Sequence, residues 1–519
     1  MINMKASFRC RLLGISQLSC VCLVLSLAVL CRTGTCESQV PVCWEELSEF
    51  SVSAFSNPAV FKDKYRISQP VSFDNAPAFI AFPRTNSELQ QTLSCIHTQR
   101  LFYTVKGGGH SLGGFSSRPA PSVMVSLEQM KRVQFQPVGQ EAIVTVEGAA
   151  TWSDVYAEFK RSGLIWVVSG GLCPSVGVIG FTLGGGVGPV ARQYGMAIDN
   201  VSSFELVTAD GKRVVRASGS ENPDLFWALK GGGGGELGLR NIGVVTRVVF
   251  SVHRGPDLFT WGTLCYPKEQ LRTVLGMLFD KAVQPSFPWS TNLDAVIDAD
   301  GGICLWSIGD GPKNETSRLL SDFAEIEEAQ VNLREHNCFW EMISEYAEEH
   351  HYSAHSNASS LTRSCMLDPL AVERAESSGL LDVFSRPDMR HPSCDAHLIH
   401  FGGRISSPVR GVDHAVFAFR QSPFFLYYGC SWPVGDKSKE AEIRAHLSRW
   451  FSFVETSVCL GGYANFMDRM LVEQRSMSEL ESFYFGENAR RLREVQRSWT
   501  VQEGSSPQQS KQANAVVIM

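Results

Sequence analysis

The sequence lacks a strong excess of charge of either sign. It has 47 lysines and arginines against 53 aspartates and glutamates, a formal net charge of -6 and no basic stripe. Because proteins that bind nucleic acid usually carry a clustered basic surface, we expect no nucleic-acid partner. The sequence also lacks an internal repeat, and we expect no metal site.

A nicotinamide-binding fingerprint is also missing. That fingerprint is G-x-G-x-x-G directly after a strand, with an acidic residue about 20 positions later. The glycine cluster that begins at Gly184 is interrupted at Pro189, which breaks this spacing. The pattern therefore disfavours a nicotinamide fold.

Long apolar runs are confined to the N-terminus. Basic residues precede an apolar stretch from Leu12 to Cys31, and small residues before Glu37 offer a cleavage site. This pattern predicts a signal peptide over residues 1–36 and a secreted, extracellular or lumenal protein. The alternative is an uncleaved anchor, because the run is close to the roughly 20 residues that span a bilayer. Unless the leader is uncleaved, we expect no stable membrane partner.

Cysteine usage agrees with export. Of the 15 cysteines, five lie in the leader and ten remain, which is normal for an oxidising compartment. Asn314 and Asn357 stand in glycosylation sequons within polar stretches. The apolar surroundings of a third sequon, at Asn200, predict burial instead.

At 519 residues the chain is too long for one hydrophobic core, so we expect more than one domain. Residues 73–252 alternate β-branched runs with helical patterns. Thr85 or Asn86 can cap one helix, a strand begins at Phe102, and Asn222 can cap a helix with Pro223 in its first turn.

Residues 255–454 have the pattern of a second domain, an α+β layer. We expect strands at His397–Phe401 and Ala415–Arg420, and a charged, solvated helix from Phe323 to Tyr346. The polar tail after Trp499 is typical of disorder.

Two glycine clusters suit an anion. Gly107–Gly109 precede His110, and Gly184–Gly186 precede a short helix expected from Pro189 to Gly195. Backbone N–H groups without neighbouring Cβ atoms can surround a pyrophosphate, which points to a dinucleotide. Glycine runs are also common in tight turns. Taken alone, His110 could be a surface loop residue and Cys173 half of a disulfide.

The ordered motifs resemble the berberine-bridge-enzyme-like family of FAD-linked oxidases, whose FAD domain is of the vanillyl-alcohol-oxidase (PCMH) type. The stretch from Val105 to Ser111 resembles the family's R-S-G-G-H-S, and the stretch after Cys173 resembles the segment whose cysteine bonds the flavin. The resemblance implies covalent FAD, 8α-histidyl at His110 and 6-S-cysteinyl at Cys173. The implied cofactor-binding residues are Lys106, Gly107, Gly108, Gly109, His110, Ser111, Cys173, Gly177, Gly180, Gly184, Gly185, Gly186, Asn200 and Val245.

The resemblance covers nearly the whole mature chain and implies an α+β fold. It consists of a two-subdomain PCMH-type FAD-binding domain at 37–254 and a substrate domain of antiparallel sheet plus helices at 255–455. A C-terminal segment at 456–500 returns to the FAD domain, and a disordered tail follows at 501–519. We also predict a disulfide between Cys43 and Cys95, which would tie the N-terminal segment to the helix before His110.

Catalysis is implied at three residues, Val176, Tyr463 and Asn465. Valine at position 176 is the residue of oxygen-reactive family members, so it favours an oxidase. Phe466, however, replaces the tyrosine that serves as general base in several members. If residues 463–466 form a strand, Tyr463 faces away from Phe466 and cannot replace that base. Candidates from the second domain are His397, His400 and Tyr428.

Three further departures from the family pattern limit what can be carried over. Residues 236–240 stand where the family runs straight from glycines to N-x-G, and they are either a real inserted loop or the result of a mistaken exon boundary. Ile179 stands where glycine is usual, and the family's C-terminal D-P-x-x-x-F is absent after Trp499.

The sequence thus predicts a secreted, monomeric FAD-dependent oxidase. It would take a hydride from a small hydroxylated substrate, a carbohydrate or another alcohol, and return electrons to O2 to give H2O2. The alternatives are an oxidative cyclase or dehydrogenase of secondary metabolism, and a flavin-holding protein with little activity.

Overall fold

The computed structural model describes residues 43, 47–53, 76–117, 122–138, 141–233, 241–349, 358–409 and 414–500. The predicted leader, the insertion at 236–240, the sequon at Asn357 and the predicted disordered tail lie outside these residues. The chain divides into two units, Met1–Glu49 and Phe50–Met519. In the first unit, Cys43 and Leu47–Glu49 are described, and a 3-10 turn, η3 (Ser48–Phe50), ends at the boundary. Apart from the bonded state of Cys43, all that follows concerns the second unit.

A first sheet has four strands in the order β1-β2-β4-β3. Strands β2, β4 and β3 run parallel, which requires crossover connections, and helix α4 (Asn86–Thr98) supplies the one between β2 and β3. Thr85 caps α4 as predicted, because its hydroxyl accepts the Glu88 N–H at 3.2 Å. The strands are β1 (Ser51–Ser53), β2 (Phe79–Ala81), β3 (Phe102–Lys106) and β4 (Ser122–Ser126).

A second sheet is antiparallel, with the order β5-β6-β10-β8-β9 and β7 paired to β10. Trp152, at the start of α5 (Trp152–Arg161), packs against this sheet through Phe250, with ring centroids 6.2 Å apart. Its strands are β5 (Val133–Val138), β6 (Glu141–Glu147), β7 (Trp166–Val167), β8 (Val201–Thr208), β9 (Val214–Ser218) and β10 (Gly243–Arg254).

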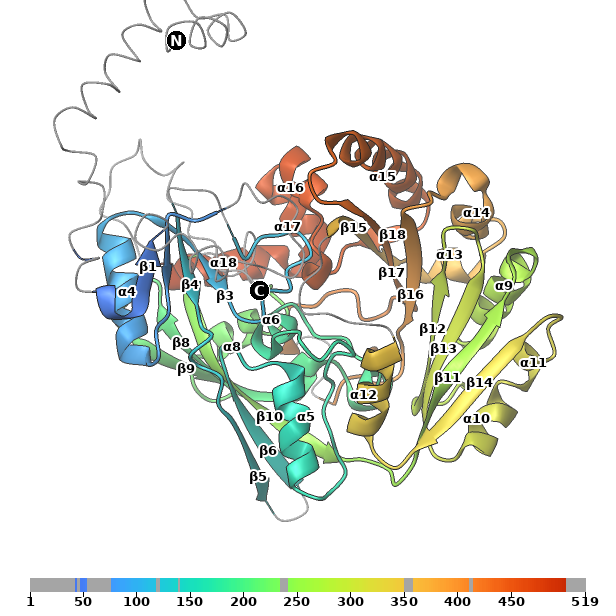
Figure 1. Cartoon of the computed structure of the whole chain (residues 1–519), viewed down its shortest axis with the longest axis horizontal. Coiled ribbons are helices and arrows are strands. Elements are labelled where there is room, and N and C mark those ends of the chain that lie inside the picture. The colour runs from blue at the N-terminus through green and yellow to red at the C-terminus, as the bar shows by residue number, and fades with distance from the viewer. Residues whose placement is uncertain are drawn as a thin grey trace, which may run out of the picture. The chain divides into compact units, whose positions relative to one another are not determined.

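A third sheet has eight strands, all antiparallel, in the order β14-β11-β13-β12-β16-β17-β15-β18. Figure 1 shows it beside the other two sheets, with α9 and α13–α15 against it. Its strands are β11 (Phe259–Tyr266), β12 (Thr291–Ile297), β13 (Ile303–Asp310), β14 (Gln330–His336), β15 (Ala358–Leu367), β16 (Cys394–His400), β17 (Phe424–Pro433) and β18 (Cys459–Gly461).

One face of the eight-stranded sheet is packed on helices. Ring pairs join β17 to α9 and to α15, with centroids 5.5 Å apart for Phe424 and Phe279 and 4.6 Å apart for Tyr428 and Trp450. The helices of this layer are α9 (Leu271–Lys281), α13 (Pro369–Glu373), α14 (Leu380–Ser385) and α15 (Lys437–Ser457). Burial of these aromatic and aliphatic side chains is the main stabilisation of the layer.

The remaining helices are short. The α-helices are α6 (Val178–Leu183), α7 (Ala191–Tyr194), α8 (Pro223–Leu229), α10 (Lys313–Leu319), α11 (Ser321–Ala324), α12 (Phe339–Glu349), α16 (Arg469–Gln474), α17 (Met477–Phe485) and α18 (Ala489–Trp499). The 3-10 turns after η3 are η4 (Ala197–Asp199), η5 (Lys268–Gln270), η6 (Pro387–Met389), η8 (Ala464–Phe466) and η9 (Gly486–Asn488). Within the described residues, no helix is both long and apolar enough to cross a membrane.

The C-terminal helices lie against the first half of the chain. The Arg491 guanidinium of α18 lies 4.0 Å from the ring centroid of Trp227 in α8 and pairs with Asp224 at 3.4 Å. The mixture of helices with predominantly antiparallel sheets confirms the predicted α+β class. The exact domain boundaries stay predictions.

Three local predictions are wrong. The charged helix expected from Phe323 to Tyr346 is interrupted by strand β14, which pairs with β11 at the sheet edge. The segment Ala415–Arg420 is irregular and not a strand; its backbone is held by Val416 N, which donates to Lys230 O at 2.8 Å. Helix α7 ends before Gly195 as predicted but begins at Ala191, two residues after Pro189.

Three disulfides join strands of the eight-stranded sheet: Cys265–Cys304, Cys365–Cys459 and Cys394–Cys430. Cys43 and Cys95 are also in the disulfide-bonded state, and their mutual pairing stays a prediction. Among the described cysteines, Cys173 and Cys338 are free.

Candidate active site

The two residues predicted to attach FAD lie around one hydroxyl group. Ser175 Oγ is 2.9 Å from His110 Nε2 and 3.3 Å from Cys173 Sγ. All three side chains are partly exposed. Because Cys173 is free, the alternative that it forms half of a disulfide does not hold in this structure.

The loops that carry these residues are packed main chain against main chain. A Cβ on Gly177 would lie only 2.6 Å from Gly108 N, so neither loop can accept a side chain at this crossing. Three backbone hydrogen bonds hold the second loop: Val176 N to Cys173 O at 3.2 Å, Ser153 N to Pro174 O at 2.9 Å and Trp152 N to Val176 O at 3.1 Å. The glycines therefore set the distance between His110 and Cys173.

The second glycine cluster is bound by the C-terminal segment. The Tyr463 hydroxyl accepts the N–H groups of Gly186 at 2.8 Å and Val187 at 3.2 Å, and the Asn465 amide at 2.9 Å. Gly186 has a φ of 76°, which favours glycine. The glycine cluster was expected to donate its N–H groups to a pyrophosphate. In this structure, the N–H groups of Gly186 and Val187 donate to the Tyr463 phenol oxygen instead.

Asn465 has a buried side-chain oxygen that is relevant to ligand binding. Its Nδ2 also donates to Phe181 O at 2.7 Å. Its Oδ1 is buried against Gly184 and has no hydrogen-bond donor among the described residues. A buried acceptor without a donor is costly, so this oxygen fits a donor group of a bound cofactor.

Residues 463–466 do not form the strand on which the orientation of Tyr463 was predicted. Ala464–Phe466 is the 3-10 turn η8, and at this spacing the rings of Tyr463 and Phe466 stack, with centroids 5.9 Å apart. Tyr463 therefore lies on the same side as Phe466. It still does not replace the missing base, because its hydroxyl is enclosed and burial raises its pKa.

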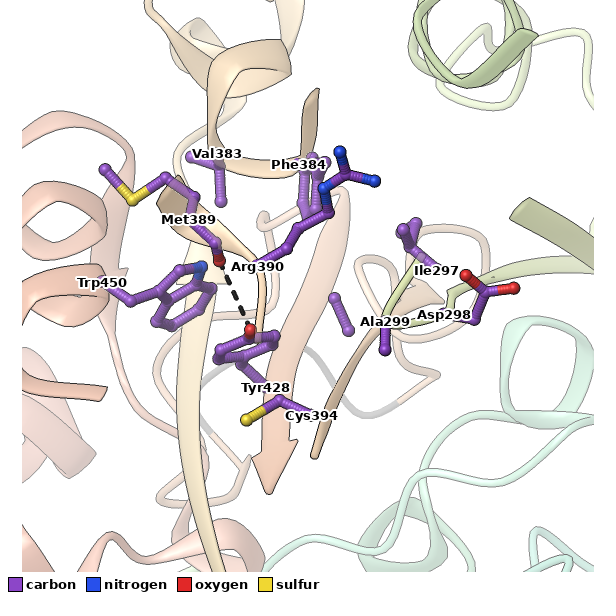
Figure 2. A pocket seen from close by; sticks show the side chains of 11 residues that line it. Ile297, Asp298, Ala299, Val383, Phe384, Met389, Arg390, Cys394, Tyr428 and Trp450 are labelled. Carbon is purple, nitrogen blue, oxygen red and sulfur yellow. Dashed lines mark hydrogen bonds between the residues drawn. The ribbon is translucent and has the colours of Figure 1, made fainter. Parts of the chain in front are cut away.

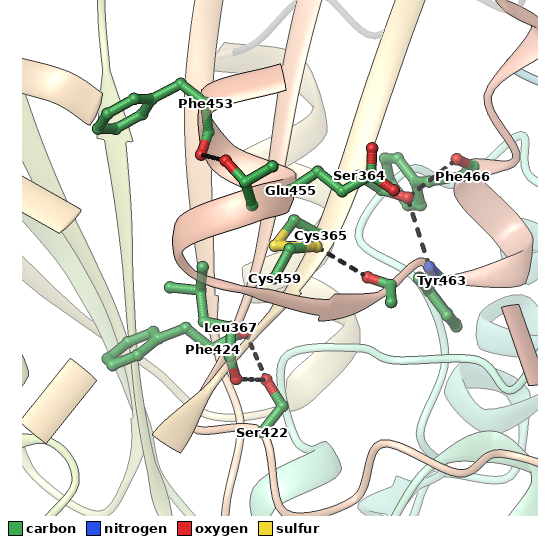
Figure 3. Close-up of a disulfide and its surroundings, with 12 residues drawn as sticks. Ser364, Cys365, Leu367, Ser422, Phe424, Phe453, Glu455, Cys459, Tyr463 and Phe466 are labelled. Carbon is green, nitrogen blue, oxygen red and sulfur yellow. Dashed lines mark hydrogen bonds between the residues drawn. A yellow bond between two sulfur atoms is a disulfide. The ribbon is translucent and has the colours of Figure 1, made fainter. Parts of the chain in front are cut away.

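Strand β15 fixes this turn, as Figure 3 shows. The Ser364 hydroxyl donates to Phe466 O at 3.2 Å and accepts Tyr463 N–H at 3.4 Å. The next residue, Cys365, forms the disulfide with Cys459 two residues before Gly461. The position of the Tyr463 and Phe466 rings is thus tied to the eight-stranded sheet.

Successive side chains of β17 point to opposite faces of the sheet, and this alternation decides which of them lie beside the Phe466 ring. The Tyr427 ring lies 4.7 Å from the Phe466 ring and is partly exposed. His397, its register partner on β16, stacks on it at 4.3 Å and is hydrogen-bonded to Asp395. Of the candidate bases from the second domain, His397 is the one on the Phe466 side.

Tyr428 points to the opposite face of the sheet. Figure 2 shows it in a small pocket beside Trp450 and Cys394, where its hydroxyl donates to Met389 O at 3.3 Å. The same hydroxyl lies 3.0 Å from Nε2 of the buried His446. Tyr428 is therefore not in contact with the Phe466 side.

His400 is also on the packed face. Its Nε2 lies 2.6 Å from an Arg192 guanidinium nitrogen and 2.9 Å from Ala282 O. Burial, and then the positive charge of Arg192, lower its pKa well below the usual value. At 2% exposure it cannot reach a substrate.

Sequence reasoning missed Tyr427 and Ser175. The alternation of β17 was a usable signal for Tyr427, because Phe425 and Tyr427 contact Phe466 whereas Tyr428 faces away. For Ser175 no signal was available, because its partner His110 lies 65 positions away in the sequence.

The remaining predicted residues are distributed along the same loops and the second sheet. Lys106 ends β3, the Ser111 hydroxyl accepts Phe115 N–H at 3.1 Å, and Gly107, Gly109, Gly180 and Gly185 lie in or next to the two glycine loops and α6. Val245 is buried in β10. Asn200 is buried, as its apolar surroundings predict, and its amide donates to Met196 O at 2.9 Å and Tyr194 O at 3.1 Å.

Comparison with known proteins finds similar sequences over part of the chain. Residues 77–217 match the FAD binding domain family. The chain is 34% identical to glucooligosaccharide oxidase of Sarocladium strictum over 189 residues, 36% of each chain. It is 32% identical to berberine bridge enzyme-like 7 of Arabidopsis thaliana over 197 residues, again 36% of each chain. These matches span about a third of the relatives' length.

Similarity to solved structures extends over most of the chain. Glucooligosaccharide oxidase from Acremonium strictum, a protein with 6-S-cysteinyl, 8α-N1-histidyl FAD, has a similar structure, with a TM-score of 0.72 at 20% identity. The comparison covers 90% of this chain and 95% of that one. The resemblance found in the sequence is thereby confirmed: residues 77–217 match the FAD binding domain family, part of the chain is similar in sequence to berberine bridge enzyme-like proteins and FAD-linked oxidases, and the fold is that of a berberine bridge enzyme-like protein.

Proposed function

We propose that the protein is a secreted oxidase with FAD attached to His110 and Cys173, which oxidises a hydroxylated substrate of carbohydrate type. The single observation that carries this proposal is the convergence of the imidazole and the free thiol on Ser175, at 2.9 Å and 3.3 Å. Two residues from separate loops can bond the same cofactor only if the fold brings their side chains close together.

The residues around this pair fit the cofactor. His110 and Cys173 would hold the isoalloxazine edge, the crossing at Gly108 and Gly177 admits a close backbone approach, and Asn465 Oδ1 offers an unused acceptor. When bound, FAD supplies the acceptor for a hydride and the route by which electrons reach oxygen. Tyr463 and Asn465 act as positioning residues, because they hold the glycine loop through the hydrogen bonds given above.

The substrate's hydroxyl proton needs an acceptor that Phe466 cannot provide. We assign this role to Tyr427, whose ring adjoins Phe466 and stacks on the His397 ring. A positioned side chain that takes the proton in the transition state typically contributes roughly 10²–10⁴-fold to the rate. Tyr463 is too deeply enclosed to take part.

Oxidase chemistry and a sugar substrate are supported by the residue at position 176, by the names of similar proteins and by polar side chains near Tyr427. Val176 is the residue that the resemblance associates with oxygen reactivity, and it lies directly after Ser175 in the attachment loop. The relatives include glucooligosaccharide oxidase, and a chitooligosaccharide oxidase has the same fold. Half-buried polar groups such as Thr362 and His397 on the Tyr427 face of the sheet suit a hydroxylated ligand.

Secretion is supported by the oxidised cysteines. Three described disulfides would not persist in the cytosol of most cells. Asn314 of its sequon is exposed on α10 and is available to a glycan.

The test is peroxide release and anaerobic flavin reduction with a panel of oligosaccharides and simple alcohols. We expect reduction by at least one oligosaccharide, with stoichiometric H2O2 in air. Tyr427→Phe should slow the reduction roughly 10²–10⁴-fold, whereas the matched control Tyr428→Phe should change it little. Reduction without peroxide would favour a dehydrogenase or cyclase. No reduction by any compound would favour a flavin-holding protein and overturn the proposal.

A further inference from the structure

Gly429 lies in the middle of strand β17, where the fold itself does not require a glycine. In the strands that the structure describes, each of the other four glycines has an atom within 3.2 Å of the place where a Cβ would lie: Gly243, Gly262, Gly309 and Gly461. At Gly429 the two nearest atoms of the described residues are 3.9 Å and 4.0 Å from that place, and its φ is outside the left-handed region. A glycine weakens the interior of a strand, and it often marks the close approach of a ligand.

The space above Gly429 has polar walls. Thr362 on β15 and Asp395 on β16 are the register partners of Gly429 on the two neighbouring strands. Their oxygens are the two atoms nearest to the missing side chain, Thr362 Oγ1 at 3.9 Å and Asp395 Oδ1 at 4.0 Å. Asp395 is exposed, and Thr362 and Gly429 are partly exposed. This space, the Gly429 notch, therefore offers a hydroxyl and a carboxylate oxygen to a group that enters it.

The Gly429 notch is next to the proposed base. Tyr427 precedes Gly429 by two positions, so both lie on the same face of the sheet, about 7 Å apart along the strand. His397, which stacks on the Tyr427 ring, is likewise two positions from Asp395 and is hydrogen-bonded to it. The notch is thus continuous with the place where Tyr427 would take the substrate's proton.

We propose that the Gly429 notch determines substrate specificity by binding a polar group of the sugar unit next to the one that is oxidised. This inference rests on the proposed function and deepens it. Because the notch is one row of side chains away from Tyr427, a substrate of two or more units reaches both places at once. The Thr362 hydroxyl can donate or accept a hydrogen bond, and the Asp395 carboxylate accepts one from a hydroxyl or an ammonium group.

Asp395 also sets the charge of the substrate. A carboxylate of the neighbouring sugar unit would lie next to the Asp395 carboxylate in the notch, and like charges in contact oppose binding. A hydroxyl or an amino group at the same place meets an acceptor instead. The substrate class that fits the notch is therefore a neutral or amino-substituted oligosaccharide, and uronic acid oligosaccharides are excluded.

The experiment fills the notch and compares substrates of different length. Gly429→Val places a side chain that is favourable in strands in the notch, and Thr362→Val removes the hydroxyl while it keeps the shape. The control is Gly276→Ala in α9, where a Cβ would meet no described atom within 4 Å. The probes are the monomer, dimer and trimer of whichever series, cello-, malto- or chito-oligosaccharide, reduces the flavin fastest. Anaerobic stopped-flow measures flavin reduction, and titration calorimetry on the reduced protein measures binding without turnover.

The wild type should bind the dimer roughly tenfold or more tightly than the monomer. Gly429→Val should remove this gain and leave the limiting rate of flavin reduction and the monomer's dissociation constant within about twofold. Thr362→Val should weaken dimer binding in the same sense, and Gly276→Ala should change nothing. If Gly429→Val does not fold, Gly429→Ala is used, because its methyl group stays at ordinary contact distance from both walls.

A charged probe tests the role of Asp395. The dimer with a carboxylate on its non-reacting unit should bind the wild type more weakly than the neutral dimer does. Asp395→Asn should reduce this difference roughly tenfold, because the amide keeps a hydrogen-bond acceptor and removes the negative charge. An undiminished difference in Asp395→Asn would overturn the assignment of the charge preference to the notch.

The remaining outcomes separate the notch from the proposed function. Equal dissociation constants for monomer and dimer in the wild type, or a dimer constant unchanged in Gly429→Val, would overturn the notch and leave the proposed oxidase intact. An equal loss of the limiting rate with monomer and dimer in Gly429→Val would show that the substitution displaces Tyr427, and it would also overturn the notch. Absence of flavin reduction by every series would overturn the proposed function, and the notch with it.

Discussion

Replacing Tyr463 with phenylalanine removes one buried oxygen that accepts three N–H groups. Two of them are backbone groups of the glycine loop, at Gly186 and Val187, and the third is the Asn465 amide. An N–H group left buried without an acceptor costs about 1–3 kcal/mol. The buried Gly186 N–H alone therefore predicts a loss of about 1–3 kcal/mol in the free energy of unfolding, and the part-buried Val187 N–H adds a smaller loss.

The control is Tyr266→Phe. Tyr266 is also buried, but its hydroxyl makes a single hydrogen bond, to Phe323 O at 2.8 Å, and that oxygen keeps the Ile326 N–H as a second donor at 3.3 Å. This variant should lose about 1 kcal/mol. Urea unfolding followed by tryptophan fluorescence measures both. Because the lost contacts hold the glycine loop, Tyr463→Phe should also retain less FAD during purification. Equal losses in the two variants would refute the reasoning.

Three further results are expected. Because Tyr427 is assigned as the base, Phe466→Tyr should change the rate of anaerobic flavin reduction less than about tenfold, and a larger gain would show that the pocket lacks its base at position 466. Burial raises the pKa of Asp294 to about 7, above its usual 3.8, so the folded chain keeps a proton that the unfolded chain releases between these values. The free energy of unfolding should therefore fall with rising pH across this window by up to about 1.4 kcal/mol per unit, and Asp294→Asn should flatten the slope in urea titrations at several pH values. Non-reducing peptide mapping should recover Cys43 linked to Cys95; another partner for either would contradict that pairing.

The sequence was sufficient to predict those elements whose ends are set by residues adjacent in the chain. The cap at Thr85, the strand from Phe102 and the helix begun by Pro223 all lie where they were predicted. The cap of the helix that begins at Pro223 nevertheless differs from the prediction. Asn222 occupies the cap position, but its amide donates to Arg216 O at 2.6 Å and not to the helix.

Contacts distant in sequence account for the failures. Strand β14 has a mostly exposed, polar sequence because it is an edge strand, and pairing with β11 overrides its helical pattern. The apolar residues Ala415–Phe417 are buried without a strand partner, and Arg420 at the end of the segment is anchored to the buried Asp199 at 2.7 Å. Neither the pairing of β14 with β11 nor the contact of Arg420 with Asp199 can be predicted from the periodicity of the local sequence.

The same limit applies to the site. The family resemblance supplied His110 and Cys173, and the structure supplied the reason that they can act on one molecule. Ser175 and Tyr427 became visible once loops and strands far apart in sequence were placed together. Tyr463 was assigned the wrong orientation because a 3-10 turn brings residues three apart to one side, where a strand would separate them.

The most direct test of the central claim is the mass of the peptides that contain His110 and Cys173 after acid denaturation of the purified protein. The account predicts that the precipitate stays yellow and that both peptides carry the mass of FAD. It also predicts that His110→Ala and Cys173→Ala each retain one link. Release of all colour into the supernatant, with unmodified peptides, would contradict the account.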